Sequence, residues 1–168
     1  IIVMALAVMP LLRVGGMQLF RMESSDQSEK ALPRAAQVAA AIGAIYVGLT
    51  MIWVALLWFA GMSGFDAVAH AMTTIATGGF STYDGSIGHF DSAAIDAIIT
   101  VGMVIGSLPF LLYLMALQGK PKNLLQDTQV QWFLTILAVI IVVIAGWLWL
   151  KNGEDPLQSL RMAAFNVV

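Results

Sequence analysis

The sequence predicts an all-α integral membrane protein, and three observations support that fold class. Only 11% of the 168 residues are charged and 60% are hydrophobic, with a mean hydropathy of +0.86. Soluble domains carry about 25% charged residues, so this chain has too few charges to cover a surface in water. Apolar stretches long enough to cross a bilayer recur along the sequence, and between two of them a short helical pattern ends in a pair of glycines.

Four apolar stretches are candidates for transmembrane helices. The chain opens in the first, 1–12, which we interpret as the end of a preceding inner helix. The second, 37–60, contains no charge and predicts a helix of about 36 Å, enough to cross a hydrocarbon core of about 30 Å with some tilt. The third is 93–117, interrupted only by Asp96, and the fourth is 129–150.

Residues 61–92, between the second and third stretches, have too few continuous apolar residues to form another span. Gly64–Ile75 predicts instead a helix of about 18 Å, roughly half a bilayer, which Gly78 and Gly79 then end. A half-helix followed by glycines and a polar return segment is the layout of a re-entrant loop, and such backbone is tolerated only inside protein or beside water. Residues 37–117 therefore predict one complete helix–pore loop–helix repeat.

Basic residues are concentrated in two loops, which sets the predicted orientation. No Lys or Arg lies between these loops. By the positive-inside rule, loops 13–36 and 118–128 are cytoplasmic and 61–92 lies outside. Four tryptophans fall toward the outer ends of two spans, where an aromatic belt is expected. The basic residues of the two loops are Arg13, Arg21, Lys30, Arg34, Lys120 and Lys122, and the four tryptophans near the outer ends are Trp53, Trp58, Trp147 and Trp149.

The chain also contains a weak internal repeat. The span 37–60 is followed by a short acidic turn at 64–66 and a half-helix. The span 129–150 is followed by a similar turn at 155–157 and a second half-helix that reaches the last residue. Repeated architecture is common in transport proteins. Residues 129–168 are therefore predicted to be the outer helix and the start of the pore helix of the next repeat.

The residues that end the first half-helix are the candidate site, because a pore must replace the water shell of a bare cation with oxygens. Backbone carbonyls from several such loops can ring the ion, and glycine lets successive carbonyls face one side because it accepts positive φ. The negative end of the helix dipole favours a cation there, and Asp66 is well placed to cap the positive end. The candidate filter residues are Thr74, Ile75, Ala76, Thr77, Gly78 and Gly79.

Two features of this region have alternative interpretations. Residues 77–79 form either a filter or an ordinary turn, since Gly-Gly pairs mark turns in many proteins. Their position after a half-length helix, between two spans and on the side without basic residues, favours the filter. Gly102, Gly106 and Pro109 mark either a kinked, gating helix or close packing between helices. We favour packing, with a kink at Pro109 in both cases.

Three polar residues in apolar surroundings receive structural interpretations. We expect His70 to be a hydrogen-bonded packing residue and Asp96 a solvated carboxylate at the outer rim, whereas for Arg161 the sequence leaves pairing with an acid and exposure to water both open.

The sequence shows no nucleophile–base arrangement, no metal-ligand cluster and no Cys. No basic run is long enough for a nucleic-acid footprint. We therefore expect neither an enzyme, nor a cofactor, nor a nucleic-acid partner.

Several segments resemble one family of transport proteins. Residues 70–82, with the sequence HAMTTIATGGFST, resemble the second pore loop of the Trk-type potassium uptake proteins in the Trk/Ktr/HKT superfamily. Residues 15–17 and 19–26 resemble the loop before that family's second repeat. Residues 106–110 resemble its following inner helix, and 161–168 resemble the start of its third pore helix. The resemblance covers nearly the whole chain and stays in register.

The resemblance implies four helix–pore loop–helix repeats of the potassium-channel type around one pore, with this chain holding the second repeat and the start of the third. It implies that Gly79 matches the filter glycine, with Thr74–Gly78 beside it, and we expect Asp66, Gly106 and Pro109 to support them. The transported ion is then K⁺, by channel or symport, in a bacterial inner membrane. The implied partners are membrane lipid, the remaining repeats, a second copy in a homodimer and a cytosolic nucleotide-binding regulatory subunit.

Two rival functions make different predictions. A secondary transporter of another small solute would use a broken helix as its binding site and would need charged or polar partners in mid-span, which these spans lack. A purely structural membrane module would tolerate small substitutions at Gly78 and Gly79 without loss of transport. A potassium-translocating protein would lose selectivity or uptake when Gly79 is changed.

Overall fold

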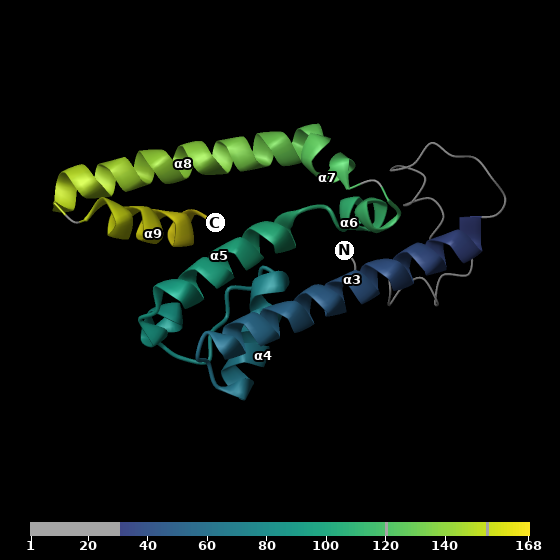
Figure 1. The fold of residues 1–168 in the computed structure, drawn as a ribbon, viewed down its shortest axis with the longest axis horizontal. Coiled ribbons are helices and arrows are strands. Elements are labelled where there is room, and N and C mark those ends of the chain that lie inside the picture. The colour runs from purple at the N-terminus through teal and green to yellow at the C-terminus, as the bar shows by residue number, and fades with distance from the viewer. Residues whose placement is uncertain (1–30, 120, 154) are drawn as a thin grey trace. The chain divides into compact units, whose positions relative to one another are not determined.

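The computed structural model confirms the all-α prediction: its described residues form helices and no strand (Figure 1). The chain divides into two units, 1–45 and 46–168, and every contact reported below lies within the second. The predicted helix end at 1–12 and the predicted loop as far as residue 30 fall outside the described residues. The described residues are 31–119, 121–153 and 155–168.

Two long helices match two of the predicted spans. α3 runs over Ala31–Phe59 and therefore begins inside the predicted loop 13–36, and α8 runs over Thr128–Asn152. By length and composition, residues 38–59 and 128–151 within them are apolar enough to cross a membrane. Helices of this length match the thickness of a hydrocarbon core.

Local capping explains where α8 begins and ends. The carboxylate of Asp127 accepts hydrogen bonds from the backbone N–H groups of Gln129 and Val130, at 2.9 and 3.2 Å. A side-chain acceptor at this position satisfies N–H groups that have no partner within the helix. Gly153, with a φ of 66°, ends the helix in the left-handed conformation that glycine adopts without strain.

α4 (Gly64–Ile75) is the half-helix that the sequence predicts. Gly61, with a φ of 106°, turns the chain between α3 and α4. The N-cap is Ser63, whose hydroxyl accepts the N–H of Asp66 at 3.2 Å and donates to the Asp66 carboxylate at 2.6 Å. The cap is therefore Ser63 and not Asp66, which lies in the first turn with its carboxylate free to bind further groups.

The third predicted span is broken into two helices. α5 covers Ala93–Ser107 and α6 covers Phe110–Leu117, and they are bent by 89°, a sharper change than the predicted kink. Pro109 lacks the N–H that would bond the carbonyl of Ile105, and it forces the preceding residue into an extended conformation. The Tyr113 hydroxyl donates to that carbonyl at 2.7 Å, so the break leaves this oxygen satisfied.

Three shorter elements complete the described chain. The 3₁₀ helix η1 (Ser86–Phe90) lies in the predicted outer loop, and α7 (Lys122–Gln126) lies in the predicted loop 118–128. α9 (Pro156–Val167) is the second half-helix of the predicted repeat. It starts with proline, whose missing N–H costs nothing at the first helical position. α9 packs against α8 and α5.

The core of the second unit forms around α4. Buried side chains reach it from α3, η1 and α5 as well as from α4 itself, so the half-helix is enclosed by elements that precede and follow it. This burial explains how a helix too short to cross a membrane is held in place. The core residues are Trp53, Leu57, Met62, Ala67, Ala71, Ile75, Ile87, Ile95 and Ile99.

Trp53 contradicts the predicted aromatic belt. Its side chain is buried, and its Nε1 donates a hydrogen bond to the carbonyl of Ile98 at 2.9 Å. Trp53 therefore joins α3 to α5 instead of facing lipid. Trp58, Trp147 and Trp149 are more than half exposed, as a belt at the membrane interface requires.

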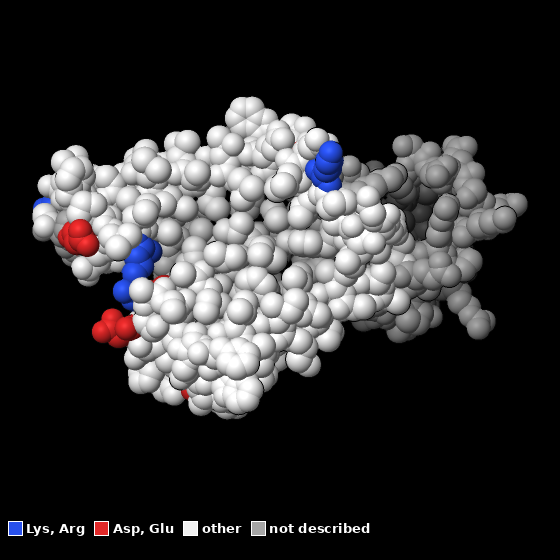
Figure 2. All heavy atoms as spheres, viewed as in Figure 1, with Lys and Arg blue, Asp and Glu red and all other residues white. Residues whose placement is uncertain are grey.

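Charged side chains are scarce on the face drawn in Figure 2. Acidic and basic atoms gather near the turn from α8 to α9 and the start of α5. Most of α8 instead presents large apolar side chains, a surface that calls for lipid or further protein against it. These exposed residues include Trp132, Ile136, Val139, Val143, Trp147 and Leu150.

Candidate functional site

α4 ends in a hydrogen-bonded turn in which Thr77 occupies a position that usually holds glycine. The N–H of Gly78 bonds the carbonyl of Thr73 at 2.7 Å, and the N–H of Thr77 bonds the carbonyl of Thr74 at 3.1 Å. These two bonds define the Schellman motif, whose residue after the cap is left-handed. Thr77 has a φ of 51°, which strains a β-branched residue. The local hydrogen bonds hold this strained conformation.

A second positive φ, of 71°, follows at Gly79. Residues 76–80 are all exposed. Within the described part of the chain, no donor bonds the carbonyls of Thr77, Gly78 or Gly79. The loop therefore presents backbone oxygens just beyond the negative end of the α4 dipole.

The structure divides the predicted filter residues into two groups. Thr74 and Ile75 are the last residues of α4 and are buried, and Ala76 is the C-cap with φ and ψ of −79° and −2°. Residues 77–79 form the irregular, exposed part. The helix ends at Ile75, as the sequence predicts, so Thr74 and Ile75 among the candidate filter residues are helical and the irregular backbone begins after the C-cap Ala76.

The carboxylate of Asp66 ties the segment after the loop to the first turn of α4. Thr82 Oγ1 donates to Asp66 Oδ1 at 2.8 Å, and Tyr83 Oη donates to Oδ2 at 3.1 Å. Hydrogen bonds from Ser63, Thr82 and Tyr83 stabilise the ionised form and hold the pKa of Asp66 below its ordinary value. The same hydrogen bond to Asp66 raises the pKa of Tyr83.

His70 makes a second tie, one turn further along α4. Its Nδ1 lies 2.8 Å from the backbone oxygen of Asp66. That oxygen only accepts, so Nδ1 carries the hydrogen and Nε2 accepts the hydroxyl of Ser81 at 2.9 Å. Ser81 Oγ in turn accepts the N–H of Tyr83 at 3.2 Å, and Phe90 packs edge-on against the imidazole. His70 is thus the hydrogen-bonded packing residue that we expect.

α5 approaches the base of the loop so closely that only glycine fits. A Cβ added at Gly102 would lie 2.1 Å from Trp53 Nε1 and 2.6 Å from Thr74 Cγ2. A Cβ added at Gly106 would lie 2.7 Å from the carbonyl oxygen of Ile75. The packing interpretation of these two glycines is therefore confirmed. Gly106 contacts the backbone of the predicted filter itself.

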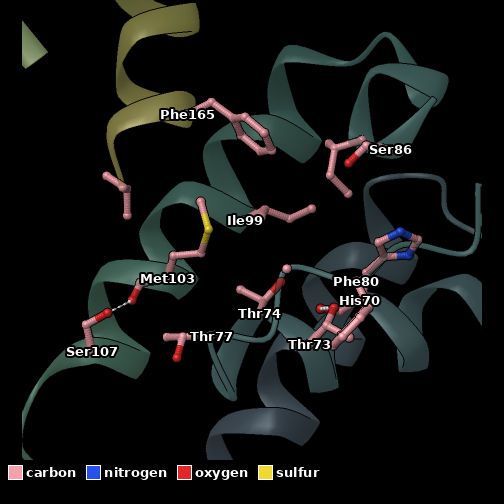
Figure 3. A pocket seen from close by; sticks show the side chains of 13 residues that line it. His70, Thr73, Thr74, Thr77, Phe80, Ser86, Ile99, Met103, Ser107 and Phe165 are labelled. Carbon is pink, nitrogen blue, oxygen red and sulfur yellow. Dashed lines mark hydrogen bonds between the residues drawn. The ribbon is translucent and has the colours of Figure 1, made fainter. Parts of the chain in front are cut away.

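A cavity of about 340 Å³ opens beside the loop. Thr73, Thr77 and Gly79 line one side, and Met103 of α5 and Phe165 of α9 line the other. Figure 3 shows the ring of Phe165 reaching from α9 toward the side chains of α5. Three segments that are far apart in sequence therefore meet at the loop.

The chemistry of this site is that of neutral oxygens. Among the described residues, no group of three or more His, Cys, Asp or Glu is placed to hold a metal ion. The oxygens beside the cavity belong to backbone carbonyls and to the hydroxyls of threonine and serine. Carbonyl oxygens in such loops can replace the hydration shell of a monovalent cation.

Sequence reasoning did not identify the side chains that hold the loop. It assigned no role to Ser81, Thr82 or Tyr83. The only local signal is Ser63 three residues before Asp66, a spacing that resembles a capping box. Nothing local signals the bonds that Asp66 makes to residues 16 and 17 positions later, because they exist only after the loop has folded back on α4.

Comparison with known proteins finds relatives that are named as potassium transport proteins. It is 43% identical along its whole length to the Trk system potassium uptake protein TrkI of Halomonas elongata and 40% identical to TrkH of Escherichia coli. The solved structure of the potassium transporter TrkH from Vibrio parahaemolyticus matches the whole chain with a TM-score of 0.79 and 34% identity. The chain covers 34%, 36% and 34% of these proteins, respectively, and so spans about a third of their length.

A family comparison agrees with these relatives. Residues 1–152 match the model of the TrkH family, described as a cation transport protein. The match includes both long helices, α4 and the loop with two positive φ values. The chain therefore belongs to the TrkH family of cation transport proteins.

Proposed function

We propose that this chain supplies one pore loop to a protein that takes up K⁺, and that the ion passes through a filter including Thr74–Gly79. The observation that carries the proposal is the pair of positive φ values at Thr77 and Gly79, at the C-terminal end of a half-helix that is buried on one face. The names of the relatives, which are potassium uptake proteins, support the choice of ion.

The alternation of φ along the loop is what an ion-binding backbone needs. Positive φ at Thr77 and Gly79, on either side of Gly78, allows neighbouring carbonyls to turn to the same side. Aligned carbonyls then replace the water around the cation, and the negative end of the α4 dipole adds a favourable field. We expect residues 77–79 to make the main contacts, because the carbonyl of Thr74 already accepts an N–H.

The proposal assigns supporting roles to residues around the loop. Asp66 and His70 hold the return segment 81–83, and Gly106 lets α5 lie against the filter backbone. Pro109 breaks the helix that follows, directly beyond this contact. Contacts on both sides of the loop hold its carbonyl oxygens in place, and such oxygens are what replaces the hydration shell of the ion.

The remaining parts of the proposal concern the whole protein. Loops 13–36 and 118–128 face the cytoplasm and 61–92 faces outside, because this orientation satisfies the positive-inside rule. The proposed setting is a bacterial inner membrane, since the relatives come from bacteria such as Halomonas elongata and Escherichia coli. The other repeats, a second copy and a cytosolic nucleotide-binding regulatory subunit complete the working protein. The proposed activity is transport and not enzymatic catalysis, with K⁺ as the transported ion and no cofactor.

Replacing Gly79 with alanine tests the filter. Gly79→Ala in the full-length protein should reduce K⁺ uptake or its preference over Na⁺ about tenfold or more, since alanine resists a φ of 71°. Uptake of both ions by a transport-deficient strain measures the effect. Gly146→Ala is the matched control, because a Cβ meets nothing within 4 Å at either position and Gly146 has no positive φ.

The result also separates the rival functions. Unchanged K⁺ uptake and K⁺ preference in Gly79→Ala, at normal membrane abundance, would contradict a filter at this loop. Uptake of a different solute that depends on the α5–α6 break but not on Gly79 would favour a secondary transporter. The filter proposal predicts loss of selectivity at Gly79 while Gly146→Ala behaves as the parent protein.

A further inference from the structure

One charged pair in the described chain joins two of the predicted repeats. Arg161 lies in α9 and Asp96 in the first turn of α5, and Arg161 Nε approaches Asp96 Oδ2 at 2.7 Å. The Asp96 side chain is only 17% exposed and the Arg161 side chain 36%. The expectation of a solvated rim carboxylate at Asp96 is therefore wrong, because α9 covers this side chain. Of the two alternatives left open for Arg161, pairing with an acid and exposure to water, the structure shows pairing with an acid.

The pair forms one end of a longer contact between α5 and α9. Phe165 follows Arg161 by four residues, and Ile99 and Met103 follow Asp96 by three and seven residues. Such spacings place each set on one face of its helix. Phe165, Ile99 and Met103 line the same cavity (Figure 3). α9 thus meets α5 through a charged contact in the first turn of α5, and apolar side chains of both helices face a shared cavity further along.

α5 also touches the candidate filter at its other end. Gly106 lies against the backbone of Ile75 and Gly102 against Thr74. A single helix therefore contacts α4 through its glycines and α9 through Asp96. α9 also packs against α8 and lines the cavity beside the loop, so the Asp96–Arg161 pair is one of several contacts that set the position of α9 relative to the loop, and it is the charged one.

We propose that Asp96 and Arg161 are positioning residues that fix the half-helix α9 against α5, and thereby set the spacing between the filter segment of this repeat and that of the next. The proposal rests on the proposed function, since it assigns α9 to a pore helix. Neither residue contacts the ion. A partly buried pair suits this role, because each charge is costly to leave without the other and the contact is directional.

Charge neutralisation and charge exchange in the full-length protein test the pair. Asp96→Asn and Arg161→Gln should each lower the K⁺ over Na⁺ uptake ratio about three- to tenfold, the range expected for losing a modest coupling. The double exchange D96R/R161D should recover at least half of the loss. Asp155→Asn is the matched control, because it removes an exposed carboxylate at the start of α9 and should leave the ratio unchanged.

A measurement independent of transport keeps this test separate from the proposed function. This chain contains no Cys, so a Met103→Cys and Phe165→Cys pair reports the distance between α5 and α9, with cysteines outside the chain replaced by serine. Oxidative cross-linking should fall in the Asp96→Asn background and return in the exchange background. If the parent protein took up no K⁺, the proposed function would fail while cross-linking still tested the pair.

The outcomes decide between the alternatives. A selectivity ratio and a cross-linking yield that both stay at parental values in Asp96→Asn would overturn the proposal. If the single variants do not accumulate in the membrane, accumulation of D96R/R161D supports the pair. If D96R/R161D does not accumulate in the membrane while Asp155→Asn accumulates normally, the two residues act separately, and this result would overturn the proposal.

Discussion

The two half-helices α4 and α9 have the same length, 12 residues each, but very different surroundings. Ser63 caps α4 with its side chain, whereas Asp155 makes no side-chain hydrogen bond at the start of α9. The buried residues of α4 are Asp66, Ala67, His70, Ala71, Thr74 and Ile75, and those of α9 are Ser159 and Ala163.

The segment that follows α4 accounts for much of the difference. Residues 81–83 return along α4 and bond Asp66 and His70, and η1 then adds Ile87 to the core. α9 has α8 and α5 as its neighbours in this chain. The comparison teaches that α4 is enclosed by the helices on either side of it in the chain, α3 and α5, and is fastened by the segment that follows it, so its burial depends on residues outside its own sequence.

The largest expected effect comes from adding a methyl group where α4 is wedged between α3 and α5. Gly102→Ala places a Cβ within 2.1 Å of Trp53 Nε1 and should destabilise the protein by about 3 kcal/mol. Thermal unfolding of the purified full-length protein measures this loss. Gly146→Ala, in open space on α8, should be neutral or slightly stabilising. Equal stability of the two variants would show that α4 is not wedged at this point.

The next effect concerns the tie between α4 and its return segment. Asp66→Asn replaces an acceptor of three hydrogen bonds with an amide. We expect it to lower the unfolding temperature and to reduce the preference for K⁺ over Na⁺. Both losses should be several-fold larger than those caused by Asp155→Asn at the start of α9. Because the fold lowers the pKa of Asp66 below 3.8, its stabilising contribution is present above that value and is lost as pH falls through the folded-state pKa.

The pH dependence checks the sign of this effect. The stability difference between parent and Asp66→Asn should stay constant from about pH 8 to pH 5 and shrink only in stronger acid. Unfolding measured across that range tests it. A difference that disappeared between pH 8 and pH 5 would mean that Asp66 is not held in its ionised form by Ser63, Thr82 and Tyr83.

Two serines compare the half-helices directly. Ser63→Ala removes the N-cap of α4 and should cost about 1 kcal/mol. Ser159 is fully buried in α9, and its hydroxyl finds no hydrogen-bond partner in the part of the chain that the structure describes. Ser159→Ala should therefore be neutral or stabilising. A loss at Ser159 comparable to that at Ser63 would reveal a partner for this hydroxyl in the rest of the protein.

The smallest effect concerns the strain at the end of α4. Thr77→Gly should stabilise the fold by about 0.5–1 kcal/mol, because glycine adopts the observed φ of 51° without steric cost. The K⁺ over Na⁺ ratio should fall if the threonine holds the loop oxygens in place. Unfolding and uptake measured on one preparation separate the two effects. A loss of stability would indicate that Thr77 is not strained.

Much of the fold was predictable because it depends on local patterns. The uncharged stretches predict α3 and α8, Gly64–Ile75 predicts α4, and Pro109 predicts a disturbance in the third stretch, since each signal lies within one helix length. The size of the bend was not predictable. Proline marks the break but not its angle, and the donors that the Ile105 carbonyl then finds, the Tyr113 hydroxyl and the N–H of Leu108, are set by the bent structure.

The amino-acid sequence by itself indicated that this protein is surrounded by lipid, and it located the long helices and the loop that carries the candidate filter. It could do so because hydropathy and glycine chemistry act over a few residues. Tertiary structure alone decided that Trp53 faces α5, that Asp66 holds Thr82 and Tyr83, and that Asp96 meets Arg161. The physical reason is that these contacts join residues 16 to 65 positions apart, and a polar side chain buried by folding must bond whichever partner the packing brings to it.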